Sequence, residues 1–149
     1  MIAPLKTVFQ YRDKEKNAIE KGLDENDIVI VTGKAGVGKT RLVLESIKNF
    51  CGDEDYKVLC IKSNGLNLYD DLVSYTEKPG GYLFFIDDAN ELKELQSVFE
   101  YIIKKHLGDM VKVVLTVRDY AKECVISEAK KYSVPKIIEI KPFTDEEIK

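Results

Sequence analysis

The chain has 149 residues, a length that predicts one domain with a hydrophobic core of its own. Charged residues make up 33% of the chain and the net charge is −3, which disfavours nucleic acid as a partner because nucleic-acid-binding domains concentrate positive charge. The three cysteines lack the spacing of zinc sites or disulfide frameworks, and no apolar run approaches the ~18 residues of a membrane span. We therefore expect a cytoplasmic protein without a membrane partner.

The first predicted element is a charged helix over residues 11–23, which Gly22 is expected to end. A polar connector follows, and the next run of β-branched and apolar residues, Ile28–Thr32, predicts a strand. Such an uninterrupted apolar run is typical of a strand that is buried on both faces of a parallel sheet.

The stretch from Gly33 to Thr40 carries the pattern Gly-x-x-x-x-Gly-Lys-Thr, between that strand and a predicted helix over residues 41–50. Glycines let successive backbone N–H groups turn toward one anion, and the helix N-terminus adds partial positive charge. In such a loop Lys39 reaches the β- and γ-phosphates, and the hydroxyl of Thr40 ligates Mg²⁺. The stretch therefore predicts a phosphate-binding loop for a nucleoside triphosphate. The alternative is a glycine-rich turn that binds nothing.

The remaining pattern alternates strands and helices. Strands are predicted over residues 56–61, 82–86, 111–117 and 135–140, and helices over residues 69–76, 91–106 and 121–132. This alternation predicts an α/β domain of three layers, α/β/α, around a five-stranded parallel sheet. In open sheets of this kind, ligands bind at the carboxyl ends of the strands.

The C-terminal end carries a capping box, with Thr144 at the N-cap and Glu147 three residues later. A further helix is thus predicted to begin just before the last residue. We expect residues 1–149 to be one nucleotide-binding domain from a longer multidomain protein, with the nucleotide core at residues 28–141.

Two carboxylates, Asp87 and Asp88, directly follow the predicted strand over residues 82–86. Mg²⁺ takes oxygen ligands and keeps most of its water, so Asp87 at the strand end is a candidate metal ligand. Asp88 is a candidate catalytic base that orients or deprotonates the attacking water. It is equally able to cap the helix that follows.

The next predicted strand ends in Thr116-Val117-Arg118-Asp119. A hydroxyl and a guanidinium placed beyond a central strand are able to reach a γ-phosphate. The alternative is a structural ion pair between Arg118 and either Asp119 or Asp88. An arginine that is paired in the absence of nucleotide is also able to move to phosphate in its presence, so the two interpretations are compatible.

Three segments, Gly-Lys-Ala-Gly-Val-Gly-Lys-Thr, Phe-Phe-Ile-Asp-Asp and Leu-Thr-Val-Arg-Asp, resemble the motifs of the STAND NTPases, signal-transduction ATPases with numerous domains. Residues 8–15 are similar to that family's Phe-x-Gly-Arg-x-x-Glu segment near the adenine, with Tyr11 in place of the glycine. The resemblance implies the strand order 5-1-4-3-2 and makes Arg118 the sensor arginine at the γ-phosphate. It also places Phe9 and Arg12 near the adenine, and it implies helical and winged-helix parts beyond the last residue.

The expected function is binding of ATP with Mg²⁺ and slow hydrolysis, as the nucleotide switch of a signalling or defence ATPase that forms homo-oligomers at full length. The predicted nucleotide-binding residues are Gly33, Lys34, Ala35, Gly36, Val37, Gly38, Lys39, Thr40, Arg41, Thr116, Arg118, Phe9 and Arg12. The predicted metal ligands are Thr40 and Asp87, and the predicted catalytic residues are Lys39, Asp88 and Arg118.

Other functions that use the same loop remain open. A small-molecule kinase usually carries an arginine-rich lid, which residues 120–149 lack. In a GTPase, a segment with lysine recognises guanine, and residues 116–119 occupy a comparable place without that lysine. A DNA-dependent motor is disfavoured by the acidic charge balance.

Overall fold

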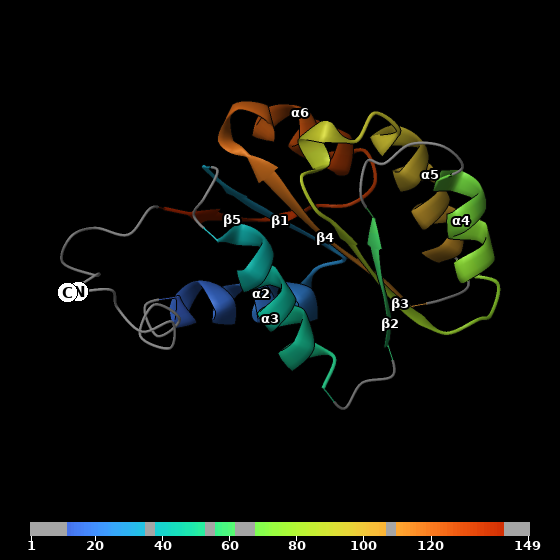
Figure 1. The fold of residues 1–149 in the computed structure, drawn as a ribbon, viewed down its shortest axis with the longest axis horizontal. Coiled ribbons are helices and arrows are strands. Elements are labelled where there is room, and N and C mark those ends of the chain that lie inside the picture. Colours follow the sequence, from blue (N-terminus) through green and yellow to red (C-terminus); the bar gives the residue numbers. More distant parts are fainter. Residues whose placement is uncertain (1–11, 35–37, 53–55, 62–67, 107–109, 142–149) are drawn as a thin grey trace.

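The computed structural model describes residues 12–34, 38–52, 56–61, 68–106 and 110–141. Its strands are β1 (Ile28–Gly33), β2 (Tyr56–Ile61), β3 (Gly81–Ile86), β4 (Met110–Arg118) and β5 (Lys136–Ile140). They form one five-stranded sheet in the order β2-β3-β4-β1-β5, and every neighbouring pair is parallel (Figure 1). This is the expected order 5-1-4-3-2 read from the opposite edge, so the predicted fold is confirmed.

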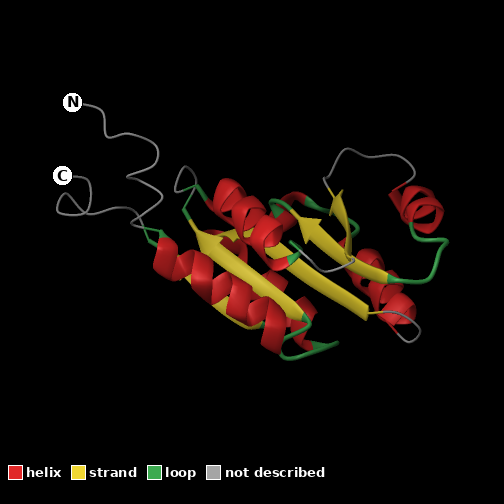
Figure 2. Cartoon of the chain, turned by 90° about the horizontal axis from the view of Figure 1, so that it is seen from below, coloured by secondary structure: helices red, strands yellow, loops and turns green. Residues whose placement is uncertain are grey.

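Helices cover both faces of the sheet (Figure 2). The α-helices are α2 (Asp13–Glu25), α3 (Lys39–Phe50), α4 (Leu68–Tyr75), α5 (Leu95–His106) and α6 (Lys122–Lys130), with short 3₁₀ helices η1 (Ala89–Glu91) and η2 (Asp119–Ala121). The helices α2 and α3 pack on one face through a core that includes Val31 and Phe85. The other face packs against α4, α5 and α6 through a core that includes Phe84 and Leu115.

This division follows from the strand order. The connection from β1 to β2 passes β4 and β3 in one direction along the sheet, whereas the three later connections run in the opposite direction. Crossovers between parallel strands are right-handed, so α3 lies on one face and α4, α5 and α6 lie on the other. All five strands consequently point their carboxyl ends toward the same edge, where the loop after β1 lies.

The prediction that Gly22 ends the first helix is wrong. Helix α2 continues through Gly22 to Glu25, and Gly22 is buried. A Cβ at this position would lie 3.2 Å from Cγ of Lys136 and 3.2 Å from Cγ2 of Val29. The glycine therefore allows the helix to approach β1 and β5 closely, and its role is in packing.

The helix predicted over residues 91–106 begins later than expected. Residues 89–91 form the 3₁₀ helix η1, and the α-helix α5 starts only at Leu95. Leu92, extended with φ −87° and ψ 107°, ends η1 and separates it from α5, and Asp88 before η1, with φ 48° and ψ 56°, lies in the left-handed region. A residue in this conformation turns the chain sharply away from the direction of β3.

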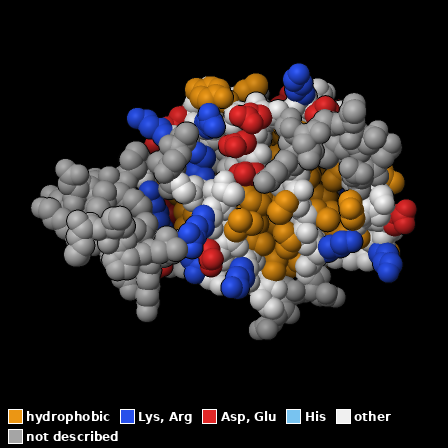
Figure 3. Space-filling model, in the orientation of Figure 1, with side chains coloured by type: hydrophobic (Ala, Val, Ile, Leu, Met, Phe, Trp, Pro, Cys, Tyr) orange, Lys and Arg blue, Asp and Glu red, His pale blue; other side chains and the backbone are white. Residues whose placement is uncertain are grey.

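The edge strand β2 is only partly covered by other elements. Val58 is 38% exposed and Cys60 is also exposed, because β2 is the edge strand and pairs only with β3. Leu44 of α3 is 45% exposed as well. Figure 3 shows hydrophobic side chains at the surface in the region between α3 and β2. No helix in the described ranges is both long enough and apolar enough to cross a membrane.

Candidate nucleotide-binding site

The predicted phosphate-binding loop joins β1 to α3 at the carboxyl edge of the sheet. Gly38 is the N-cap of α3, with φ 85° and ψ 25°, and a Cβ added there would meet no atom within 4 Å. Glycine is therefore favoured here because the backbone is left-handed, a conformation that other residues adopt only at a cost in free energy. Steric crowding around the position is not the reason. Ala35, Gly36 and Val37, as well as Phe9, lie outside the described residues.

Lys39 lies over the start of the loop. Its Nζ donates hydrogen bonds of 2.8 Å to the backbone oxygens of Gly33 and Lys34, and the residue is only 7% exposed. Burial lowers the pKa of the Lys39 ammonium, and the nearby carboxylate of Asp88 opposes this shift. The ammonium is thus a largely desolvated cation beside the loop, held by carbonyls that an anionic oxygen is able to replace.

Asp87 brings two threonines together. Its Oδ1 accepts a hydrogen bond of 2.8 Å from Oγ1 of Thr40, at the start of α3, and one of 2.7 Å from Oγ1 of Thr116 in β4. The two predicted metal ligands, Thr40 and Asp87, therefore lie in direct contact although 47 residues separate them. A hydroxyl and a carboxylate are both oxygen donors of the kind that Mg²⁺ prefers, so this donor set fits the ion.

Thr116 also fixes Asp88. The Thr116 side chain is completely buried, and its Oγ1 accepts a hydrogen bond of 2.8 Å from the backbone N–H of Asp88. The left-handed conformation of Asp88 is thus held by a side chain from the neighbouring strand. The carboxylate of Asp88 makes no capping hydrogen bond to η1, so the helix-cap interpretation of this residue finds no support. One hydroxyl therefore orients both acidic residues at the end of β3.

Arg118 is the last residue of β4, and its register partner in β1 is Gly33, the first residue of the loop. This pairing places Arg118 at the edge that also carries Lys39 and Asp87. Within the described residues, the Arg118 guanidinium forms no ion pair with Asp88 or Asp119. One oxygen of Asp119, Oδ1, is buried and accepts no hydrogen bond there. The structural ion pair that the sequence left open is thus not formed.

The other predicted contacts are less central. Lys34, Thr40 and Arg41 are exposed at the loop edge. Arg12 is 6% exposed, directly precedes α2, and its Nη1 lies 3.4 Å from Oε1 of Glu15. Its predicted place near an adenine remains a prediction.

Two residues of this edge were not predicted from the sequence. The backbone N–H of Arg118 donates to Oδ1 of Asn90 at 3.3 Å, and Nδ2 of Asn90 donates to the hydroxyl of Tyr120 at 3.1 Å. The sequence carries only a weak signal: Asn90 is a polar residue two positions after the Asp87-Asp88 pair, just before the predicted helix over residues 91–106.

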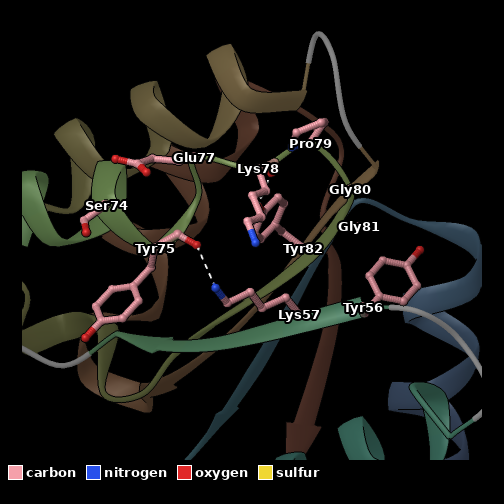
Figure 4. Close-up of a pocket in the computed structure, with 10 residues that line it drawn as sticks. All are labelled: Tyr56, Lys57, Ser74, Tyr75, Glu77, Lys78, Pro79, Gly80, Gly81 and Tyr82. Carbon is pink, nitrogen blue, oxygen red and sulfur yellow. Dashed lines mark hydrogen bonds between the residues drawn. The ribbon is translucent and has the colours of Figure 1, made fainter.

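A hollow of about 340 Å³ lies elsewhere, between the beginnings of β2 and β3 and the end of α4 (Figure 4). It is lined by Tyr56, Lys57, Ser74, Tyr75, Glu77, Lys78, Pro79, Gly80, Gly81 and Tyr82. Nζ of Lys57 donates a hydrogen bond of 3.0 Å to the backbone oxygen of Tyr75 across it. Because the strands are parallel, their beginnings lie at the edge opposite the loop, and this hollow is separate from the predicted nucleotide site.

The sequence matches the model of the family Novel STAND NTPase 3 over residues 11–147. No curated protein matches the chain.

Three solved structures show the same fold at low identity. The RuvB Holliday junction branch migration motor of Thermotoga maritima is 18% identical, with a TM-score of 0.60 over 97% of this chain and 47% of that chain. The closed state of Hsp104 with ATPγS and FITC-casein is 14% identical, with a TM-score of 0.66 over 91% of this chain and 28% of that chain. Trip13 from Rhizobiales is 12% identical, with a TM-score of 0.61 over 97% of this chain and 69% of that chain. The chain thus spans less than half of that RuvB chain and less than a third of that Hsp104 chain.

Proposed function

The chain belongs to the novel STAND NTPase 3 family, and on that premise we propose that it binds ATP with Mg²⁺ and hydrolyses it slowly as the nucleotide switch of a larger cytoplasmic protein. Family and fold make it a P-loop NTPase module that binds nucleotide. One observation carries the proposal of Mg²⁺-dependent ATP binding. Thr40 and Thr116 both donate hydrogen bonds of 2.7–2.8 Å to Asp87, near the buried ammonium of Lys39.

The phosphates are bound by Lys39 and by the loop. Lys39 exchanges the backbone oxygens of Gly33 and Lys34 for phosphate oxygens, and this exchange is favourable because a desolvated ammonium gains more from an anion than from neutral carbonyls. The choice of ATP is supported by the presence of ATPγS in the Hsp104 structure that shares this fold.

Thr40 and Asp87 hold the metal. Mg²⁺, when bound, supplies neutralisation of the charge on the β- and γ-phosphates. The Thr40 hydroxyl donates its proton to Oδ1 of Asp87 and keeps its lone pairs, so it would be able to offer one of them to the cation without losing this hydrogen bond. Thr116 keeps its bond to Asp87 and continues to orient that carboxylate.

Hydrolysis uses Asp88 and Arg118. Asp88 accepts a proton from the attacking water or orients that water. The hydrogen bond from the backbone N–H of Asp88 to Oγ1 of Thr116 fixes the backbone from which the Asp88 side chain extends. Arg118, whose guanidinium has no carboxylate partner in the described residues, binds the third phosphate. A side chain that contacts only the third phosphate distinguishes ATP from ADP, which is what a nucleotide switch requires.

The rest of the switch lies in parts that this chain does not include. We propose that residues 1–149 are the nucleotide-binding domain of a longer protein, with helical and winged-helix parts after it, and that the full-length protein forms homo-oligomers in the ATP-bound state. Binding to the third phosphate then biases the arrangement of those parts.

Two measurements test the proposal. In a competition experiment, bound ATP is retained when GTP is added at equal concentration, and displacement of half of it would contradict the choice of adenine. In a phosphate-release assay, Asp88→Asn reduces the slow hydrolysis roughly 10²-fold while ATP affinity stays within a factor of about two. Consumption of ATP that occurs only with a small-molecule acceptor would instead favour a kinase.

A further inference from the structure

The strand that carries Arg118 extends beyond its neighbour. The last register pair between β3 and β4 joins Ile86 to Leu115, whereas β4 continues to Arg118. On the other side, Arg118 pairs with Gly33 of β1. The end of β4 therefore has a strand partner on one side only.

Asn90 takes the place of the missing strand. Its side-chain oxygen Oδ1 accepts the backbone N–H of Arg118 at 3.3 Å, on the side where β3 has already ended. Asn90 reaches this position because the left-handed Asp88, held by Thr116, turns the chain into η1. Ala89, which precedes it, is 1% exposed and anchors η1 in the core.

The other end of the same amide is also engaged. Nδ2 of Asn90 donates a hydrogen bond of 3.1 Å to the hydroxyl of Tyr120, whose side chain belongs to η2 and is 78% exposed. An amide that donates to one residue and accepts from another has its orientation fixed by both. Asn90 therefore links the segment after β3 both to the last residue of β4 and to η2.

We propose that Asn90 is a positioning residue that places Arg118 for contact with the third phosphate and so sets the preference for ATP over ADP. This inference rests on the proposed function, in which Arg118 binds that phosphate. The guanidinium has no carboxylate partner in the described residues, so its position depends on the backbone from which it extends. Removing the Asn90 amide releases that backbone on one side, and the contact with the third phosphate weakens while contacts with the first two remain.

The experiment compares dissociation constants of the Mg²⁺ complexes of ATP and ADP, measured by calorimetry, for wild type and Asn90→Ala. We expect ATP affinity to fall about tenfold and ADP affinity to change less than about twofold, since the effect of one hydrogen bond is of this size. Asn49→Ala, an exposed asparagine at the far end of α3, is the matched control and leaves both constants unchanged.

A double-mutant cycle with Arg118→Ala separates positioning from general damage. If Asn90 acts through Arg118, Asn90→Ala has no further effect on the ATP-to-ADP ratio once the arginine is gone. Tyr120→Phe removes only the contact to Nδ2 and leaves an exposed ring. We expect it to lower the ratio about twofold without affecting folding, so it tests the proposal even if Asn90→Ala is unstable.

The outcomes are distinct. An unchanged ATP-to-ADP ratio in Asn90→Ala and Tyr120→Phe, or additive effects of Asn90→Ala and Arg118→Ala, would overturn the positioning role alone. Equal affinity of the wild-type protein for ATP and ADP would overturn the positioning role of Asn90 together with the proposed contact between Arg118 and the third phosphate. A wild-type protein that binds neither nucleotide would overturn the proposed function itself.

Discussion

The hydroxyl oxygen Oγ1 of Thr40 lies 2.8 Å from Oδ1 of Asp87, so the start of α3 is joined directly to the end of β3. These two residues are far apart in the chain and come from the two sequence motifs that predict metal binding. Both side chains offer oxygen atoms at the same point of the site, as a metal ligand would. Experiments can therefore test the proposed metal-binding role of Thr40 separately from the proposed phosphate-binding role of Lys39.

Thr40→Val keeps the shape of the side chain and removes the hydroxyl. We expect ATP affinity in this variant to become insensitive to Mg²⁺, because one of the two oxygen ligands from the protein is lost. Titrations with ATP in Mg²⁺ and in EDTA check this. The wild type and Thr40→Ser, which keeps the hydroxyl, bind at least about tenfold more tightly with Mg²⁺. A Mg²⁺ effect of wild-type size in Thr40→Val would exclude Thr40 as a ligand.

Thr116→Val tests the bond that fixes Asp88. The change leaves the partly buried backbone N–H of Asp88 without the hydroxyl of the fully buried Thr116, and we expect it to lower the free energy of unfolding by about 1–3 kcal/mol. The matched control is Thr32→Val in β1, where the threonine is 1% exposed and its hydroxyl makes no hydrogen bond in the described residues. Urea unfolding of both variants measures these free energies. Equal losses of unfolding free energy in Thr116→Val and Thr32→Val would mean that the hydrogen bond from Asp88 to Thr116 contributes nothing to stability.

Gly38→Ala tests the backbone of the loop. The φ of 85° at Gly38 is unfavourable for alanine, although space for a methyl group is open, and we expect the free energy of unfolding to fall by about 1–2 kcal/mol. Gly38→Asn should restore part of the loss, because asparagine tolerates this region better. Gly52→Ala, at a glycine without a positive φ, should change stability little. Thermal unfolding of the three variants gives the comparison, and a neutral Gly38→Ala would contradict a left-handed Gly38.

Lys39 should make stability depend on pH. Burial lowers its pKa in the folded protein below the ordinary value of 10.5. Between the lowered pKa and 10.5 the unfolded chain binds the proton more than the folded protein does, so the contribution of Lys39 to stability increases as pH rises through this window. Below the window both states are protonated, and the contribution is constant.

Lys39→Met removes this proton while keeping most of the side-chain volume. The difference in unfolding free energy between wild type and Lys39→Met should therefore move in favour of wild type as pH rises toward 10.5. Chemical unfolding at a series of alkaline pH values measures this difference, in which the other lysines cancel. A difference that is independent of pH would mean that the Lys39 ammonium is as well solvated in the folded protein as in the unfolded chain.

The strands were predictable because their signals are local. Apolar runs such as Ile28–Thr32 bury both faces, and the strand boundaries observed differ from those expected by a residue or less. Periodicity says nothing about which strands lie side by side, however. The lateral order came from the resemblance to STAND NTPases, and the sheet confirms it.

The details of the site were not predictable, because they depend on contacts between strands. Nothing in the residues around Asp88 indicates a left-handed backbone, which is stabilised by the hydroxyl of Thr116, 28 residues away. Gly22 was misassigned for the same reason: a glycine near a helix end resembles a stop, and only the approach of Val29 and Lys136 reveals its role in packing. Cys60 follows the pattern of a buried strand but lies in an edge strand, a property that the strand's own sequence does not contain.

The measurement that tests the central claim most directly is calorimetric titration of ATP with Mg²⁺ into the wild-type protein and into Lys39→Ala. The ammonium of Lys39 is held over the loop by the oxygens of Gly33 and Lys34, and our account makes it the main cation for the phosphates. We predict that the wild-type protein binds ATP and that Lys39→Ala, with an unchanged circular dichroism spectrum, binds at least about tenfold more weakly. Equal affinity of the two folded proteins would contradict the assignment of this loop to the nucleotide.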